Sequence, residues 1–384
     1  MGIGFQINSN SACAWIGLAM AVLCSCSVPV AGQSNQQNLI NHSQVKPSVS
    51  GIKRFEIVSS LQSGITFTNR LAGLEYYKNM VAHNGAGVAV GDVNGDDLAD
   101  IFLCNIQGGN ELYLNDGDFR FKSVSGPQEV KDAINTGATL VDVDGDGDND
   151  LLINGVKFGT RLFLNDGAGG FELSQDSGLD ISGTTTSMAL ADVDADGDLD
   201  LYVAHYIDWM HLADPTTRFE YSRRGDKLMI TRINGESTLK PKWKDRFTIS
   251  NTGRVRELPE ADRLYLNNGN GTFRDVSTEP RFVIDGNAQS LSSFREWGLA
   301  VTFRDVNNDN LPDLYVCNDF ASPDRFWINK GKGQFELTGY KNIRHTSRSS
   351  MGVDFTDLNS DGVPDFMLLD MLDPSRARRL VQLE

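Results

Sequence analysis

Five copies of one nine-residue aspartate pattern constrain this chain more than any other feature. They are DVNGDDLAD from residue 92, DVDGDGDND from 142, DVDADGDLD from 192, DVNNDNLPD from 305 and DLNSDGVPD from 357. All fit D-x-[DN]-x-D-x-x-x-D, and consecutive copies begin 50, 50, 113 and 52 residues apart. Because a fixed period of this size is typical of repeat architectures, we expect one structural unit to recur, with an insertion in the long gap.

Strand-like segments surround each loop. An apolar segment precedes it, as in GVAV and ATLV, and another follows, as in DIFLCN and DLLING. In four units a further strand and turn come next: ELYLNDGDFRF, RLFLNDGAGGFEL, RLYLNNGNGTFRD and RFWINKGKGQFEL. The Asn-Gly and Asp-Gly turns suit tight hairpins. Four strands per unit predict an all-β fold, a β-propeller of four-stranded blades.

The loops themselves have the chemistry of a calcium site. Positions one, three and five offer side-chain oxygens, position seven its backbone carbonyl and position nine a carboxylate, and such hard oxygen ligands suit Ca²⁺. We therefore predict up to five calcium ions. The predicted metal ligands are Asp92, Asn94, Asp96, the Leu98 carbonyl and Asp100; Asp142, Asp144, Asp146, the Asp148 carbonyl and Asp150; Asp192, Asp194, Asp196, the Asp198 carbonyl and Asp200; Asp305, Asn307, Asp309, the Leu311 carbonyl and Asp313; Asp357, Asn359, Asp361, the Val363 carbonyl and Asp365.

Other readings of the loops fit less well. An EF-hand ends in Glu at position twelve between helices, whereas position twelve here is apolar: Leu103, Ile153, Val203, Val316 and Leu368. Mg²⁺ prefers a tight octahedral site that keeps its waters, and Zn²⁺ prefers Cys or His. An Asx-rich turn without an ion is the remaining alternative for any single loop, but five loops in register argue against it.

The net charge of the chain limits the class of macromolecule that it can bind. The formal net charge is −16, and an acidic surface repels a nucleic-acid backbone. We therefore expect no nucleic-acid partner. Much of the acidity belongs to the loops, where bound cations would offset it.

The N-terminus is typical of an exported protein. Residues 12–32 are apolar and small, and no Lys, Arg, Asp or Glu precedes Lys46. This predicts a signal peptide at 1–32, a polar linker at 33–52 and the propeller at 53–384, with a secreted, periplasmic or cell-surface protein that has no membrane span once the signal is removed. A retained anchor and a lipid-modified Cys26 are the alternatives. Cys104 and Cys317 are predicted to be buried strand residues.

An insertion interrupts the third unit at about 207–258, and a shorter extra stretch lies near 282–293. Residues 218–256 carry 11 Lys or Arg against four Asp or Glu. A solvated flap and a binding loop for an anionic ligand, such as an acidic polysaccharide, are the two interpretations. Surface loops tolerate such insertions at low entropic cost, so we expect the blade to be preserved.

Catalysis has little support in the sequence. The chain contains no HExxH, GxSxG, P-loop or paired-cysteine motif. His205 and His211 lie near Asp208 and offer a candidate site, but such histidines are more often ordinary polar residues. We therefore predict no catalytic residues and no enzyme.

The repeated strand–loop–strand pattern with its LYLNDG-type turns resembles the FG-GAP and VCBS repeats of integrin-α-like propellers. GITFTNR at 64, HNGAGVAVGDVNGD at 83 and SMGVDFTDLNSDGVPD at 350 are similar to the cartilage acidic protein type, whose bacterial members often carry a C-terminal ASPIC/UnbV domain. The resemblance covers about 53–384. It implies an extracellular calcium-binding propeller with an adhesion or ligand-binding role toward a protein or polysaccharide.

The resemblance also implies seven blades, whereas the five loops predict an incomplete propeller of about five to six. A truncated chain is favoured over closure with fewer blades, because an open propeller leaves unpaired strand edges. Some related propellers are lyases with a metal at the central channel. A lyase or hydrolase acting there on a carbohydrate derivative is therefore the alternative function.

Overall fold

The computed structural model describes residues 56–371, except 72–80, 209, 213, 226, 251–252, 321, 339–342, 344–345 and 348. The predicted signal peptide, its alternatives and the linker lie outside these residues. Within them, no helix is long and apolar enough to cross a membrane. The helices are short: α1 (Ser60–Ser63), η2 (Val81–His83), η3 (Gln128–Val130), η4 (Pro241–Trp243) and η5 (Leu291–Ser293).

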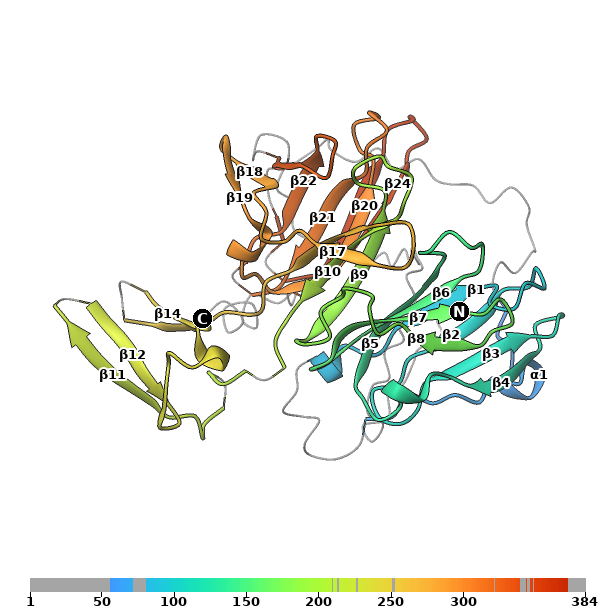
Figure 1. Ribbon diagram of the computed structural model, residues 1–384, viewed down its shortest axis with the longest axis horizontal. Coiled ribbons are helices and arrows are strands. Elements are labelled where there is room, and N and C mark those ends of the chain that lie inside the picture. The colour runs from blue at the N-terminus through green and yellow to red at the C-terminus, as the bar shows by residue number, and fades with distance from the viewer. Residues whose placement is uncertain are drawn as a thin grey trace, which may run out of the picture.

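The strands form successive antiparallel sheets, which we number as blades 1 to 5 (Figure 1). Blade 1 has β1 (Val88–Gly91), β2 (Asp100–Leu103), β3 (Glu111–Asn115) and β4 (Phe121–Ser125); blade 2 has β5 (Asn135–Val141), β6 (Asp150–Gly155), β7 (Gly159–Asn165) and β8 (Phe171–Leu173); blade 3 has β9 (Thr185–Ala191), β10 (Asp200–His205), β16 (Arg263–Asn267) and β17 (Phe273–Asp275). Blade 4 has β20 (Gly298–Arg304), β21 (Asp313–Asn318), β22 (Arg325–Asn329) and β23 (Phe335–Leu337), and blade 5 has β24 (Ser350–Thr356) and β25 (Asp365–Asp370).

The first strands of neighbouring blades lie side by side. A Cβ on Gly87, just before β1, would come within 2.5 Å of the Gly137 Cα in β5. The Thr136 hydroxyl donates to the Thr185 carbonyl at 2.6 Å, and the Thr186 hydroxyl donates to the Gly298 carbonyl at 2.8 Å. These contacts order β1, β5, β9 and β20 around a common axis, the arrangement of a propeller.

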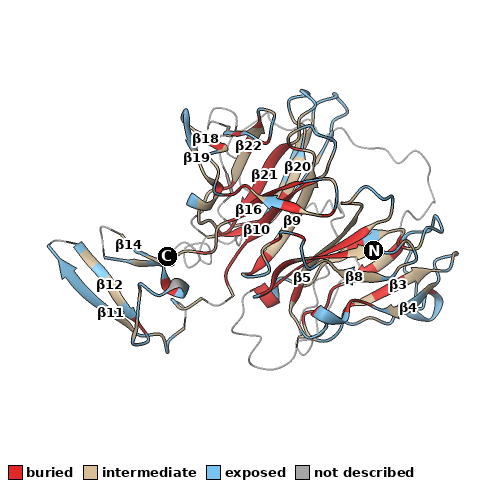
Figure 2. Ribbon diagram, in the orientation of Figure 1, coloured by how far each residue is buried: buried red, intermediate tan, exposed pale blue. Residues whose placement is uncertain are grey.

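The hydrophobic cores lie between blades, because alternate residues of a strand face opposite sides of its sheet. In β10, Leu201 and Val203 pack toward blade 2, whereas Tyr202 and Ala204 pack toward blade 4. All six residues of β6, β10 and β21 are buried, and Figure 2 shows β10 and β21 largely in the buried colour. Each second strand thus joins two cores.

The predicted all-β propeller of four-stranded blades is confirmed, and the sheets of the described residues do not close into a ring. Among the described strands, neither β24 nor β25 pairs with β1. Strand β25 of blade 5 has large apolar side chains that are exposed, among them Phe366, Met367 and Leu369.

The insertion leaves blade 3 intact. Strands β11 (Phe219–Arg224), β12 (Lys227–Ile233), β13 (Glu236–Ser237), β14 (Phe247–Ile249) and β15 (Val255–Glu257) lie between β10 and β16. They form two small sheets of their own that extend away from the blades (Figure 1). Strands β10 and β16 still pair directly, with Tyr202 opposite Leu264.

The shorter extra stretch becomes part of the next blade. Strands β18 (Phe282–Ile284) and β19 (Asn287–Gln289) form a hairpin, and β18 pairs in parallel with β23 of blade 4. Blade 4 therefore has six strands, where the repeat pattern predicted four. Phe282 is fully buried against Trp327 and Phe335, so apolar packing fastens the end of blade 3 to blade 4.

Candidate metal centre

Each aspartate loop connects the first and second strands of a blade, so all five occupy equivalent places. In a four-stranded antiparallel blade the first-to-second and third-to-fourth connections share one end, and the second-to-third connection lies at the other. The loops therefore lie at one end of the blades, which we call the loop end. The insertion joins the second and third strands of blade 3 and lies at the opposite end, which we call the insertion end.

The first aspartate of each loop organises the loop backbone. Asp92 accepts hydrogen bonds from the amides of Gly95 at 2.8 Å and Asp97 at 2.7 Å. The remaining loops repeat the bond from the amide of position six, at 2.8 to 3.0 Å. These backbone amides, that of Gly362 foremost, lower the pKa of Asp357. The local hydrogen bonds thus favour the charged form of Asp357.

Every loop turns sharply at position six. The φ angle is positive at Asp97, Gly147, Gly197, Asn310 and Gly362. Position four also has a positive φ, including 65° at Ala195. The left-handed backbone at these two positions bends the loop around the first aspartate. The side-chain oxygens of alternate residues therefore face the inside of the loop.

Replacement of Gly197 by Ala tests this backbone requirement. The φ of Gly197 is 100° and no heavy atom would lie within 4 Å of an added Cβ, so the cost comes from the backbone alone. We expect Gly197→Ala to lose about 1–2 kcal/mol of stability, seen as a lower melting temperature in calcium. Ala195→Gly is the reverse change at a residue with φ of 65° in the same loop, and it should leave the melting temperature unchanged or raise it, because it relieves the same backbone strain. Equal losses in both variants would contradict this account.

Carboxylates converge most closely in the second and third loops. Oxygens of Asp142, Asp144 and Asp146 lie within 4.8 Å of one another, as do those of Asp192, Asp194 and Asp200. One oxygen of Asp194 is buried and has no hydrogen-bond partner among the described residues. Such an orphaned acceptor costs about 1–3 kcal/mol, and a bound cation would satisfy it. The donors fit a hard cation such as Ca²⁺.

The other predicted ligands lie within the same loops with local partners. The amide of position seven donates to the carboxylate of position five in all five loops, at 2.8 to 3.0 Å. This pairing involves Leu98, Asp148, Asp198, Leu311 and Val363. The Asn side chains that replace Asp at position three cap the loop amides: Asn94, Asn307 and Asn359 each accept from the amide of position five.

The position-nine aspartates have a structural role that the ligand pattern did not predict. Asp150 accepts from the amide of Val143 at 3.0 Å and, across the sheet, from the amide of Asn165 at 2.9 Å. Asp100, Asp200 and Asp313 make the same two bonds, and Asp365 makes the first of them. Burial raises the pKa of Asp150 to about 6 and that of Asp200 to about 7. A neighbouring cation would favour the charged form.

Asparagines at the ends of the third strands extend this connection to the preceding blade. The Asn165 side-chain amide donates to the Val93 carbonyl, Asn267 to Val143, and Asn329 to Val193, at 2.9 to 3.0 Å. We call these residues the asparagine clamps. The recurrent Asn in LFLN, LYLN and FWIN is the sequence signal for these clamps, although within one unit it indicates only a turn.

The remaining sequence candidates have separate environments. His205 is buried, its ring lies 3.2 Å from the Val203 carbonyl, and burial lowers its pKa to about 4. His211 instead contacts Trp243 edge-on, with 4.8 Å between ring centroids. Cys104 and Cys317 are buried free cysteines, as predicted, and burial raises the pKa of Cys104 to about 12.

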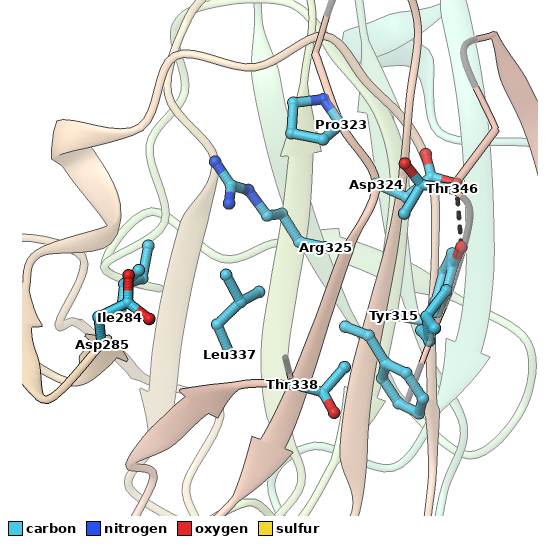
Figure 3. A pocket seen from close by; sticks show the side chains of 11 residues that line it. Ile284, Asp285, Tyr315, Pro323, Asp324, Arg325, Leu337, Thr338 and Thr346 are labelled. Carbon is cyan, nitrogen blue, oxygen red and sulfur yellow. Dashed lines mark hydrogen bonds between the residues drawn. The ribbon is translucent and has the colours of Figure 1, made fainter. Parts of the chain in front are cut away.

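A cavity of about 200 Å³ lies beside blade 4 (Figure 3). Its most buried acid, Asp324, accepts from the Tyr315 hydroxyl at 2.9 Å and the Ser350 hydroxyl at 2.6 Å. Arg325 forms an ion pair with Glu296. Because protein partners already occupy these polar groups, the cavity is a weak candidate for a ligand site.

Comparison with known families and structures complements this geometry. A model of FG-GAP-like repeats matches residues 92–153, 142–203, 242–316 and 305–368. No curated protein sequence shows significant similarity. Among solved structures, an Agrocybe aegerita lectin that recognises non-reducing terminal N-acetylglucosamine is 17% identical, with a TM-score of 0.31 and 73% of each chain covered. Rhamnogalacturonan lyase YesW is 11% identical, with a TM-score of 0.33; the match covers 74% of this chain and 55% of the lyase.

Proposed function

Because the chain belongs to the FG-GAP-like repeat family, we propose that it is an exported propeller that binds calcium at its loop end and an extracellular protein or polysaccharide at its insertion end. One observation carries the proposal: the acidic loops and the basic insertion leave blade 3 at opposite ends. Calcium in the loops then lies away from the ligand, and its role is mainly structural.

The contacts of the loops support a structural role. Within a blade, the position-nine aspartate joins the loop to the third strand, and the asparagine clamp joins that strand to the loop of the preceding blade. A cation held by the first, third and fifth positions would therefore stiffen an existing connection between blades. From the motifs quoted above, we further propose that the protein is of the cartilage acidic protein type and has an adhesion role.

We favour a binding role over catalysis. The sequence contains none of the catalytic motifs HExxH, GxSxG, P-loop or paired cysteines. The discriminating experiment exposes the calcium-loaded protein to a panel of polysaccharides and surface proteins, with binding and turnover both measured. Binding without turnover is expected, whereas release of a sugar product would favour the lyase or hydrolase alternative. Absence of binding to the whole panel would count against the proposed ligand role.

Calcium affinity should differ between loops. The second loop has carboxylates at positions one, three, five and nine, whereas the fifth has Asn359 at position three, and an extra carboxylate strengthens Coulombic attraction to the ion. We expect Asp146→Asn to cause a larger loss of calcium affinity than Asp361→Asn in titration calorimetry. The two variants remove the same position from each loop. An equal or larger loss for Asp361→Asn would contradict the ranking.

A further inference from the structure

A polar cavity lies at the insertion end, where segments distant in sequence converge. Its volume is about 380 Å³, within the range of ligand sites, and its lining includes Lys157, Thr184, Asp208, Lys244, Glu260 and Arg295. These residues come from blade 2, the connection into blade 3, the insertion and the segment before β20. A second hollow of about 260 Å³ shares Gly183, Glu260 and Arg295 with it, so the two adjoin.

The cavity has an excess of positive charge in an acidic protein. Lys242 and Arg246 also line it, which gives five cations against Asp208 and Glu260. Three of the five are already paired. Asp208 lies 3.5 Å from Lys157 and 3.6 Å from Arg246. Arg246 also pairs with Glu257 at 3.1 Å, and Lys242 pairs with Glu236. In the described part of the chain, no carboxylate forms an ion pair with Lys244 or Arg295. The positive charges of these two side chains are therefore available to a ligand.

Thr184 provides an independent indication of a missing partner. Thr184 is a fully buried residue of the cavity wall, and its hydroxyl has no hydrogen-bond partner among the described residues. The Thr184 amide is occupied, because it donates to Glu260 at 3.0 Å. A buried hydroxyl without a partner is costly, and a polar ligand group in the cavity would remove that cost.

The combination of charges selects the chemistry of the ligand. Lys244 and Arg295 suit a carboxylate, while Asp208 and Glu260 suit hydroxyl donors and would repel a densely charged polyphosphate. An uncharged sugar would leave the cations unpaired. We propose that this cavity binds a carboxylated sugar, a uronate unit of an acidic polysaccharide. The inference rests on the proposed ligand role of the insertion end and specifies its ligand class.

The test measures binding of calcium-loaded protein to polygalacturonate and to its methyl-esterified form, which differ in the carboxylate charge. Polygalacturonate should bind at least about tenfold more tightly, because its free carboxylates can form charge-assisted hydrogen bonds that the methyl esters cannot. Dextran sulfate is the third probe. Equal affinity for the esterified polymer, or tighter binding of dextran sulfate than of polygalacturonate, would overturn the proposal.

Variants locate the site. Lys244→Ala and Arg295→Ala should each weaken polygalacturonate binding about tenfold, whereas Lys227→Ala, an exposed cation on the β11–β12 hairpin, should leave it unchanged. Thr184→Val is nearly isosteric and should weaken binding several-fold without lowering the melting temperature. Equal affinities across all four folded variants would overturn the assignment to this cavity.

The same measurements separate this inference from the broader function. If polygalacturonate fails to bind while a surface protein or neutral polysaccharide of the panel does, the uronate assignment is wrong and the ligand-binding role stands. If nothing in the panel binds, the ligand-binding role fails as well.

Discussion

Chelation of calcium is expected to lower the melting temperature of this protein by on the order of 10 °C or more. Each saturated site adds about 2.7 kcal/mol at a hundredfold excess over its dissociation constant, and a fold of this size shifts by about 2–4 °C per kcal/mol. Removal of the ion also exposes mutual repulsion among the converging carboxylates of the second and third loops. Scanning calorimetry with calcium and with EDTA measures the difference.

Metal exchange supplies the control for chelation. Calcium added back after EDTA should restore the melting temperature, whereas equimolar Mg²⁺ should restore it only in part, because Mg²⁺ keeps its waters and demands octahedral geometry. An unchanged melt in EDTA would remove the claim of structural calcium.

The Asn267→Asp substitution is expected to lower the free energy of unfolding by about 3 kcal/mol, because it replaces a buried hydrogen-bond donor with an acceptor. The Asn267 side chain donates to the Val143 carbonyl of the preceding blade and to Leu199. A carboxylate there would face two carbonyl oxygens and lie beside Asp200, which accepts a hydrogen bond from the Asn267 backbone amide at 2.9 Å. The melting temperature in calcium should fall by about 6–12 °C.

The adjacent Asn268→Asp is a matched control for this clamp. Asn268 is exposed, and among the described residues its side chain bonds within its own turn, to Thr272. The same chemical change there should shift the melting temperature by less than about 2 °C. If both variants melt alike, the clamp does not join blades 2 and 3.

Much of the local structure could be predicted because it depends on residues close in sequence. Alternating apolar residues identify the strands beside each loop, and Gly147, Gly197 and Gly362 mark where the backbone must turn left-handed. The oxygens predicted to bind metal lie within nine residues of one another, so one turn of chain brings them together. Asp97 and Asn310 occupy the equivalent position in two other loops and also have a left-handed backbone, since Asp and Asn tolerate that conformation.

Other features depend on contacts between blades, for which the chain has no local signal. The parallel pairing of β18 with β23 joins residues about 50 positions apart. The donor of the asparagine clamp and its acceptor are separated by 72 residues for Asn165 and by 136 for Asn329. The cavity at the insertion end combines segments from Lys157 to Arg295.

The sequence alone determined the repeat, the strand pattern and the acidic loops, because each follows from side-chain alternation and turn chemistry within one unit. Only the tertiary structure decided how the units meet: which face of each second strand packs on which neighbour, that the position-nine aspartates also bind backbone amides, and that Thr184, Lys244 and Arg295 share one cavity. Packing between blades brings distant residues together, and its geometry is a property of the assembled sheets.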